Sequence, residues 1–200
     1  MKSPDLNMKY FLFNCLGNRE KEEYCFTVKT PDGGVSTYDL TSGLRLSDEY
    51  PDGIEPVFLK LDDRFPGLEL ASYIGNASNL LPFHISAANL IHQLSQCEIE
   101  LIPFTLLNPK GNVHSEEYVF VNPVGATDCV NWNETVCTRR KNGDIANYEK
   151  IVMDKSKVKD FPNLFRIQNK SSLCVFSETI VDALMKAHHN NLVFIELEVA

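Results

Sequence analysis

The sequence contains none of the short motifs that mark the commoner catalytic and cofactor sites. It has no Gly-x-Ser-x-Gly elbow, no phosphate-binding loop ending in Gly-Lys-Ser or Gly-Lys-Thr, no dinucleotide fingerprint and no Cys-x-x-Cys pair. A nucleophilic serine on a sharp turn, a cradled phosphate and a structural zinc each depend on one of these spacings. We therefore expect no cofactor and no metal site.

Basic residues are scarce. The chain has 19 Lys and Arg against 27 Asp and Glu, a formal net charge of −8, and residues 81–138 hold a single basic residue, Lys110. Proteins that bind nucleic acids need a basic surface to neutralise phosphates, so no nucleic-acid partner is expected. An acidic surface suits a basic protein partner, because complementary charges speed association.

Long apolar runs are missing as well. Crossing a bilayer takes about 20 apolar residues, and no run in this chain approaches that length. Lys9, the short run Tyr10–Phe13 and Cys15 resemble a lipoprotein signal only weakly, because Asn14 stands where a small residue is needed. The preferred interpretation is a first β-strand, in a cytoplasmic protein that does not contact a membrane.

Six cysteines, at positions 15, 25, 97, 129, 137 and 174, do not require disulfide bonds. A chain of 200 residues can bury a sizeable core without covalent cross-links. Several of the cysteines lie in apolar runs such as Leu173–Phe176, where a thiol behaves as a small apolar group. The sequence therefore predicts reduced thiols in a reducing compartment.

The chain divides into an irregular first part and a more regular second part. Residues 1–79 are interrupted by turn signals such as Pro51-Asp52-Gly53, and we expect an N-terminal extension or small lobe there. Residues 80–200 are expected to form one domain. They contain two similar units, each with a strand, a serine that caps a helix, the helix itself and a second strand.

In the first unit Ser86 precedes a helix through Leu94, and in the second Ser177 precedes a helix followed by a strand over 192–199. Further strands lie between the units, with a turn at Asn108–Gly111 and a hairpin signal at Asn142-Gly143. The predicted fold class is α+β. It consists of a mixed, mainly antiparallel sheet with two short helices packed on it, plus the N-terminal extension.

The order of several segments in the second part resembles a known family. The segments are Pro82–Ser86, Glu100–Phe104, Asn108–Gly111, Tyr118–Val124, Asp128–Val130, Pro162–Arg166 and Val175–Glu178. Over about residues 80–199, this order and spacing looks like immunity family eleven of the bacterial polymorphic-toxin systems, formerly a domain of unknown function. The resemblance implies an antitoxin-like protein that protects its own cell by binding a cognate toxin. It implies no catalytic residue.

The acidic residues of the second part are the candidate partner-binding residues. They are Glu98, Glu100, Glu116, Glu117 and Asp128. Glu98 and Glu100 are expected on one face of a strand whose other face carries Ile99 and Leu101. The ordinary interpretation is a solvated sheet face that keeps the protein soluble. The functional interpretation is an acidic patch that docks on a basic toxin.

Two other interpretations stay open. One is a small hydrolytic enzyme with a carboxylate site or a Cys–His site, such as Cys97 with His84 or His92. The run Asp62-Asp63-Arg64 is more typical of a local ion pair than of such a site. The other is a scaffold subunit, which would expose an apolar patch. A pocket with several convergent titratable groups would favour the enzyme.

Overall fold

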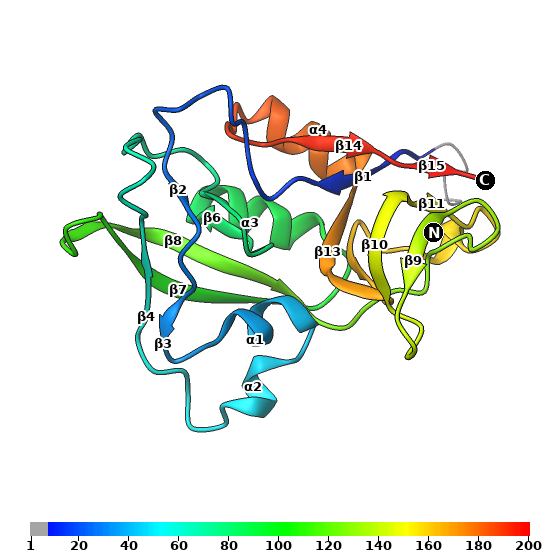
Figure 1. Ribbon diagram of the computed structural model, residues 1–200, viewed down its shortest axis with the longest axis horizontal. Helices are drawn as coiled ribbons and strands as arrows, with labels where there is room; N and C mark the ends of the chain where they lie inside the picture. Colours follow the sequence, from blue (N-terminus) through cyan, green and yellow to red (C-terminus); the bar gives the residue numbers. More distant parts are fainter. Residues whose placement is uncertain (1–7) are drawn as a thin grey trace.

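The computed structural model describes residues 8–200 and contains two principal β-sheets (Figure 1). The five-stranded sheet has the order β3–β4–β7–β8–β6, and the four-stranded sheet has the order β12–β13–β1–β14. Their strands are β1 (Tyr10–Phe13), β3 (Asp32–Gly33), β4 (Val57–Lys60), β6 (Pro82–His84), β7 (Ile99–Leu107), β8 (Val113–Pro123), β12 (Leu164–Ile167), β13 (Lys170–Ser177) and β14 (Phe194–Glu196).

Short strand pairs and four helices complete the fold. The pairs are β2 (Phe26–Thr27) with β5 (Gly75–Asn76), β9 (Val136–Arg139) with β10 (Ile145–Lys150), and β11 (Val152–Met153) with β15 (Glu198–Val199). The helices are α1 (Thr37–Ser42), α2 (Leu46–Glu49), α3 (Ile85–Leu94) and α4 (Glu178–Lys186), with a 3₁₀ turn at Val158–Asp160. The predicted α+β class with mainly antiparallel sheets is confirmed. Within residues 8–200, no helix has the length and apolar character needed to span a membrane.

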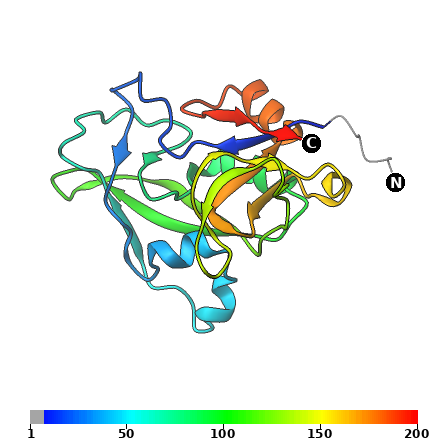
Figure 2. The ribbon, with the colours of Figure 1, turned by 45° about the vertical axis from the view of Figure 1, so that its right-hand side comes forward.

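One apolar core joins the two sheets. Side chains from both sheets meet α3 and α4 there, and the ring centroid of Phe13 lies 5.6 Å from that of Phe83 and 5.3 Å from that of Phe176. The opposite face of the five-stranded sheet is covered by α1 and α2, through Leu40 and Leu46 (Figure 1). A third core lies between the four-stranded sheet and β10 and β11, on the side that comes forward in Figure 2.

The first part of the chain is not set apart from this fold. Strand β1, predicted from its apolar run, lies in the four-stranded sheet between β13 and β14. Strands β3 and β4 belong to the five-stranded sheet, where β4 pairs with β7. The expected extension or lobe over 1–79 is therefore corrected: residues 10–60 supply strands to both sheets. Residues 1–7 of the expected extension lie outside the described residues.

The two predicted strand–helix–strand units are present, with differences at their caps. Helix α3 begins at Ile85, and His84 rather than Ser86 caps it, because the Nδ1 atom of His84 accepts the N–H of Ser86. Ser177 does occupy the N-cap position of α4, but its hydroxyl donates to Asn163 Oδ1 at 2.9 Å instead of capping the helix. The expected last strand is interrupted at Leu197, which separates β14 from β15.

Candidate functional site: a groove beside strand β7

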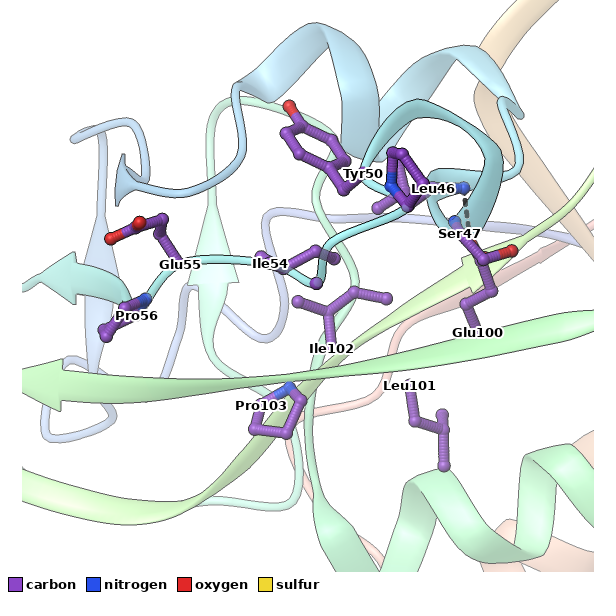
Figure 3. Close-up of a pocket in the computed structure, with 12 residues that line it drawn as sticks. Leu46, Ser47, Tyr50, Ile54, Glu55, Pro56, Glu100, Leu101, Ile102 and Pro103 are labelled. Carbon is purple, nitrogen blue, oxygen red and sulfur yellow. Dashed lines mark hydrogen bonds between the residues drawn. The ribbon is translucent and has the colours of Figure 1, made fainter.

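The groove arises where two neighbouring strands separate. Strand β4 pairs with β7 in parallel only from Phe58 opposite Thr105 onward. If this register continued two residues back from Phe58, Pro56 would lie opposite Pro103. Neither proline has an N–H to donate to a neighbouring strand. The segment Ile54–Pro56 therefore leaves β7, and Gly34 N–H holds it from the other side by donating to Pro56 C=O at 3.4 Å. A groove of about 620 Å³ opens between this segment, α2 and β7 (Figure 3).

Strand β7 presents backbone groups to this groove. Leu101 lies opposite Val121 of β8, and Val121 N–H donates to Leu81 C=O, on the side away from β7. Leu101 and Val121 are therefore a non-hydrogen-bonded pair, so the N–H and C=O of Leu101 point away from β8. Backbone groups two residues apart on a strand point to the same side, so the C=O of Pro103 also points to the groove. Further along, Leu107 C=O points the same way and accepts Leu61 N–H.

The wall of the groove is largely apolar. Tyr50 and Ile54 lie above β7 and Ile102 rises from it toward them, whereas the side chain of Leu101 points to the opposite side, toward α3 (Figure 3). Tyr50 is fixed by its hydroxyl, which donates to Asp39 Oδ2 at 2.8 Å, and this hydrogen bond raises the pKa of the phenol. Within the described lining, the titratable side chains are Tyr50, Glu55 and Glu100.

Glu100 ties α2 to the sheet. Its carboxylate accepts the backbone N–H groups of Leu46 and Ser47, both at 2.8 Å, and the side-chain amide of Asn122 at 3.0 Å. Partial burial acts to raise the pKa of Glu100, but these hydrogen bonds outweigh it and hold the pKa below its ordinary value. A carboxylate held by three donors stabilises its own chain and is poorly suited to accept a substrate proton.

The carboxylate of Glu98 is also held by residues of its own chain, in this case by a single side chain. The guanidinium of Arg45 forms a two-pronged contact with it, with Nε 2.7 Å from Oε1. The contacts of Glu98 and Glu100 with neighbouring residues 45–47 confirm that both carboxylates lie on one side of the sheet. Ile99 and Leu101 pack into the core on the other side, also as predicted.

The five predicted binding residues do not form one patch. Glu116 and Glu117 lie opposite the far part of β7, near Phe104, which is four residues or about 13 Å along the strand from Glu100. Asp128 follows β8 and pairs with Lys157 at 2.7 Å, so the ammonium group of Lys157 offsets its charge. Their role in binding a partner stays a prediction.

Sequence reasoning missed a different acidic surface. Four exposed carboxylates follow one another on α2 and the turn after it: Asp48, Glu49, Asp52 and Glu55. Arg45 is the single basic residue between positions 30 and 59; its guanidinium contacts Glu98, and its Nη1 atom also lies 3.4 Å from Asp48 Oδ2. Of these four residues, called the acidic rim, Glu55 lines the groove, and Asp52 lies between the lining residues Pro51 and Gly53. The run of four acidic residues in eight positions was visible in the sequence, but nothing there placed it beside β7.

The Cys–His alternative finds no support in the geometry. Cys97 makes no hydrogen bond to His84 or His92 among the described residues, and burial raises its pKa to about 11. A nucleophilic thiol needs the opposite shift. Asp62 and Arg64 form the expected local ion pair, with Nη2 2.8 Å from Oδ2, which holds the pKa of Asp62 well below its usual range. No three His, Cys, Asp or Glu side chains within residues 8–200 gather as metal ligands do.

One Ser–His–Glu arrangement does occur, in a hollow of about 330 Å³ beside α3. Ser86 Oγ lies 2.8 Å from His84 Nδ1, and His84 Nε2 lies 3.8 Å from Glu117 Oε2. The Nδ1 atom also accepts the N–H of Ser86, as the cap of α3. The Glu117 side chain is 74% exposed and beyond hydrogen-bond distance, so it does not orient the ring as a catalytic triad requires.

Behind the groove, a buried arginine supports Glu100 from the second sheet. Arg166 of β12 is fully buried, and its guanidinium donates to the backbone C=O groups of Leu40, Pro123 and Ser171 at 2.8–2.9 Å. It also donates to Asn122 Oδ1 at 3.2 Å. The groove wall therefore rests on a polar network that joins both sheets.

No protein-family model matches this chain, and no curated protein sequence matches it significantly. The resemblance to immunity family eleven therefore stays a prediction from segment order.

Proposed function

We propose that this chain is an immunity-type protein that neutralises a cognate toxin by stoichiometric binding in the bacterial cytosol. The observation that supports binding over catalysis is the state of the titratable groups at the groove. Glu100 is held by three donors, and the other carboxylate of the described lining, that of Glu55, is exposed. The acidic rim suits a partner with a basic surface.

The mechanism would be occlusion. A bound toxin whose active site or substrate surface is covered cannot act, and the protecting protein needs no chemistry of its own. Protection should therefore follow the molar ratio of the two proteins. An enzyme that destroys the toxin or its product would protect at a small fraction of the toxin's amount.

The test begins with the neighbouring reading frames: where one of them encodes a toxic C-terminal domain, that domain is co-expressed with this chain. We expect growth rescue only near or above equimolar expression, and co-purification of a complex of defined stoichiometry by light scattering. Rescue at a hundredth of the toxin level, or rescue without a complex, would contradict the proposal. An assembly of many copies would instead favour the scaffold interpretation.

A second candidate, a serine hydrolase, is favoured by the 2.8 Å contact between Ser86 and His84. A fluorophosphonate probe labels activated serines covalently. We expect no labelling of the native protein beyond that of the Ser86→Ala variant. Labelling at Ser86 that disappears on denaturation would make the hydrolase the better proposal.

A further inference from the structure

A polar hollow of about 310 Å³ lies where three segments distant in sequence come together. Helix α1 contributes Tyr38, the turn between β9 and β10 contributes Arg140 and Asp144, and the turn after β12 with the start of β13 contributes residues 168–172. Tyr38 is 69% exposed and Arg140 is exposed as well, so the hollow opens to solvent. Its volume is at the lower end of the usual range for ligand pockets, which suits a small molecule.

Most polar side chains of this hollow have no hydrogen-bond partner within the described part of the chain. They are those of Tyr38, Arg140, Gln168, Asn169, Ser171 and Ser172. The Nζ atom of Lys170 donates to Ala146 C=O at 3.2 Å and has further N–H groups to offer. These groups are therefore available to a bound molecule.

The lining carries an excess of positive charge in a protein whose formal net charge is −8. Arg140 and Lys170 are its cations, and Asp144 is the single acidic residue of the described lining. The carboxylate of Asp144 accepts the side-chain amide of Asn142 at 2.6 Å, and among residues 8–200 it forms no ion pair with either cation. The charge of Arg140 is therefore not neutralised in place.

A buried cation lies directly behind the hollow. Arg166 is fully buried, and its guanidinium donates to Ser171 C=O at 2.9 Å. Its acceptors within residues 8–200 are all uncharged: the backbone C=O groups of Leu40, Thr41, Pro123 and Ser171, the amide oxygen of Asn122 and the thiol of Cys174. Glu100 is joined to Arg166 only through Asn122. Buried charges are ordinarily paired, so an anion in the hollow would supply negative charge that Arg166 lacks.

The donors of the hollow suit a phosphate better than a carboxylate. A phosphate monoester carries about −1.5 to −2 charges at pH 7 and three acceptor oxygens, whereas a carboxylate has a single charge and two oxygens. The guanidinium of Arg140 matches a phosphate with two parallel hydrogen bonds, and the ammonium of Lys170 acts as a point charge. The exposed ring of Tyr38 offers a flat surface to a planar group joined to the phosphate.

We propose that this hollow binds a small phosphate monoester, with its phosphate at Arg140 and Lys170 and a planar group against Tyr38. The hydroxyls of Ser171 and Ser172 would donate to the remaining phosphate oxygens. Arg166 would act through its charge alone, from behind the wall. The hollow shares no lining residue with the groove beside β7, so the proposal does not rest on the immunity function.

The probe is phenyl phosphate, titrated into the ¹⁵N-labelled full chain at constant ionic strength. We expect saturable shifts of the amide resonances of Ser171 and Ser172, with a dissociation constant of about 1 mM or below. Two further probes separate the contributions. Inorganic phosphate lacks the ring, and benzoate has a carboxylate in place of the phosphate. Both should bind at least about fivefold more weakly than phenyl phosphate.

Matched protein variants test the location. Arg140→Gln should weaken binding of phenyl phosphate about tenfold, because a charge-assisted contact is lost. Lys159→Gln makes the same change of net charge at an exposed residue outside the hollow and should alter binding less than about twofold. Asp144→Asn removes the negative charge of the lining and should tighten binding. Tyr38→Ala should weaken binding of phenyl phosphate and leave that of inorganic phosphate unchanged.

Several results would overturn the proposal. They are the absence of saturable shifts up to about 10 mM phenyl phosphate, binding of benzoate as tight as that of phenyl phosphate, and equal losses in Arg140→Gln and Lys159→Gln. Weaker binding by Asp144→Asn would also overturn it, because the hollow would then not select an anion. Unchanged binding of phenyl phosphate by Tyr38→Ala would overturn the placement of the planar group.

Discussion

The buried guanidinium of Arg166 and the carboxylate of Glu100 are joined through a single side chain, the amide of Asn122. Asn122 Oδ1 accepts from Arg166 Nη2 at 3.2 Å, and Asn122 Nδ2 donates to Glu100 Oε2 at 3.0 Å. The cation fixes the orientation of the amide, and the amide presents its donor to the anion. A residue of the four-stranded sheet thereby helps to position the wall of a groove on the five-stranded sheet.

Replacing Asn122 with Ala should destabilise the protein. Asn122 is fully buried, and its loss leaves a donor of Arg166 and an acceptor of Glu100 without this partner. An unsatisfied buried polar group costs about 1–3 kcal/mol. The free energy of unfolding, measured in urea, should fall by that amount. The exposed Asn133→Ala is the control and should change it by less than about 0.5 kcal/mol; equal losses would mean that the network contributes nothing.

Leu184→Ala should cost about 2–5 kcal/mol of unfolding free energy, because a large buried side chain is removed from the core between the sheets. Leu184 is fully buried, and its neighbour Met185 on α4 is 55% exposed. Met185→Ala is therefore a control on the same helix and should cost well under about 1 kcal/mol. A loss below about 1 kcal/mol for Leu184→Ala would show that α4 does not pack as described.

Acidification should remove the stability that Glu100 provides. Its pKa is lower in the folded protein than in the unfolded chain, so the unfolded state takes up a proton first as the pH falls. The contribution is complete above the unfolded pKa of about 4.5 and is lost as the pH falls through the folded value. The stability difference between wild type and Glu100→Gln should therefore be largest at pH 7 and shrink below pH 4.5, as urea titrations at each pH would show. The exposed Glu116→Gln is the control, and a difference independent of pH would refute this account.

The thiols should react at two distinct rates. Burial raises the pKa of Cys15, Cys25 and Cys129 to about 12, and Cys174 is also buried, with a raised pKa. The thiolate is the reactive form. With a disulfide-exchange reagent at pH 8, we expect fast reaction at Cys137, which is partly exposed on β9. Slow reaction is expected at the four buried thiols and at Cys97, which is also partly exposed but whose pKa is raised to about 11 by burial. After unfolding without reductant all six should react at once, and fewer than six would indicate disulfide bonds.

Periodicity predicted the parts of the fold whose partners are close in the sequence. The helix expected through Leu94 is α3, and the alternation around Ile99 located β7 with the correct face inward. The cap of α3 was missed because histidine is an unusual capping residue, whereas serine is a common one. Local pattern shows which way a side chain faces, and the partner it meets depends on the rest of the chain.

The groove illustrates this limit. Glu98 and Glu100 were expected to be solvated or to bind a partner, yet they hold residues 45–47, which lie 53 or 54 positions away in sequence. The loop around Pro51 contains strong turn signals, and Gly53 N–H does donate to Tyr50 C=O at 3.0 Å. Nothing in that loop indicates which strand lies beneath it, because the contact is made by apolar side chains and one distant carboxylate.

The position of β1 has a consequence for synthesis of the protein on the ribosome. This strand pairs with β13 and β14, which emerge more than 150 residues after it. Until then Tyr10–Phe13 is an apolar segment with both edges unpaired, and such segments associate with other chains. Closing so long a loop is also slow. Until β13 and β14 have been made, the nascent chain should therefore be prone to associate with other chains through Tyr10–Phe13.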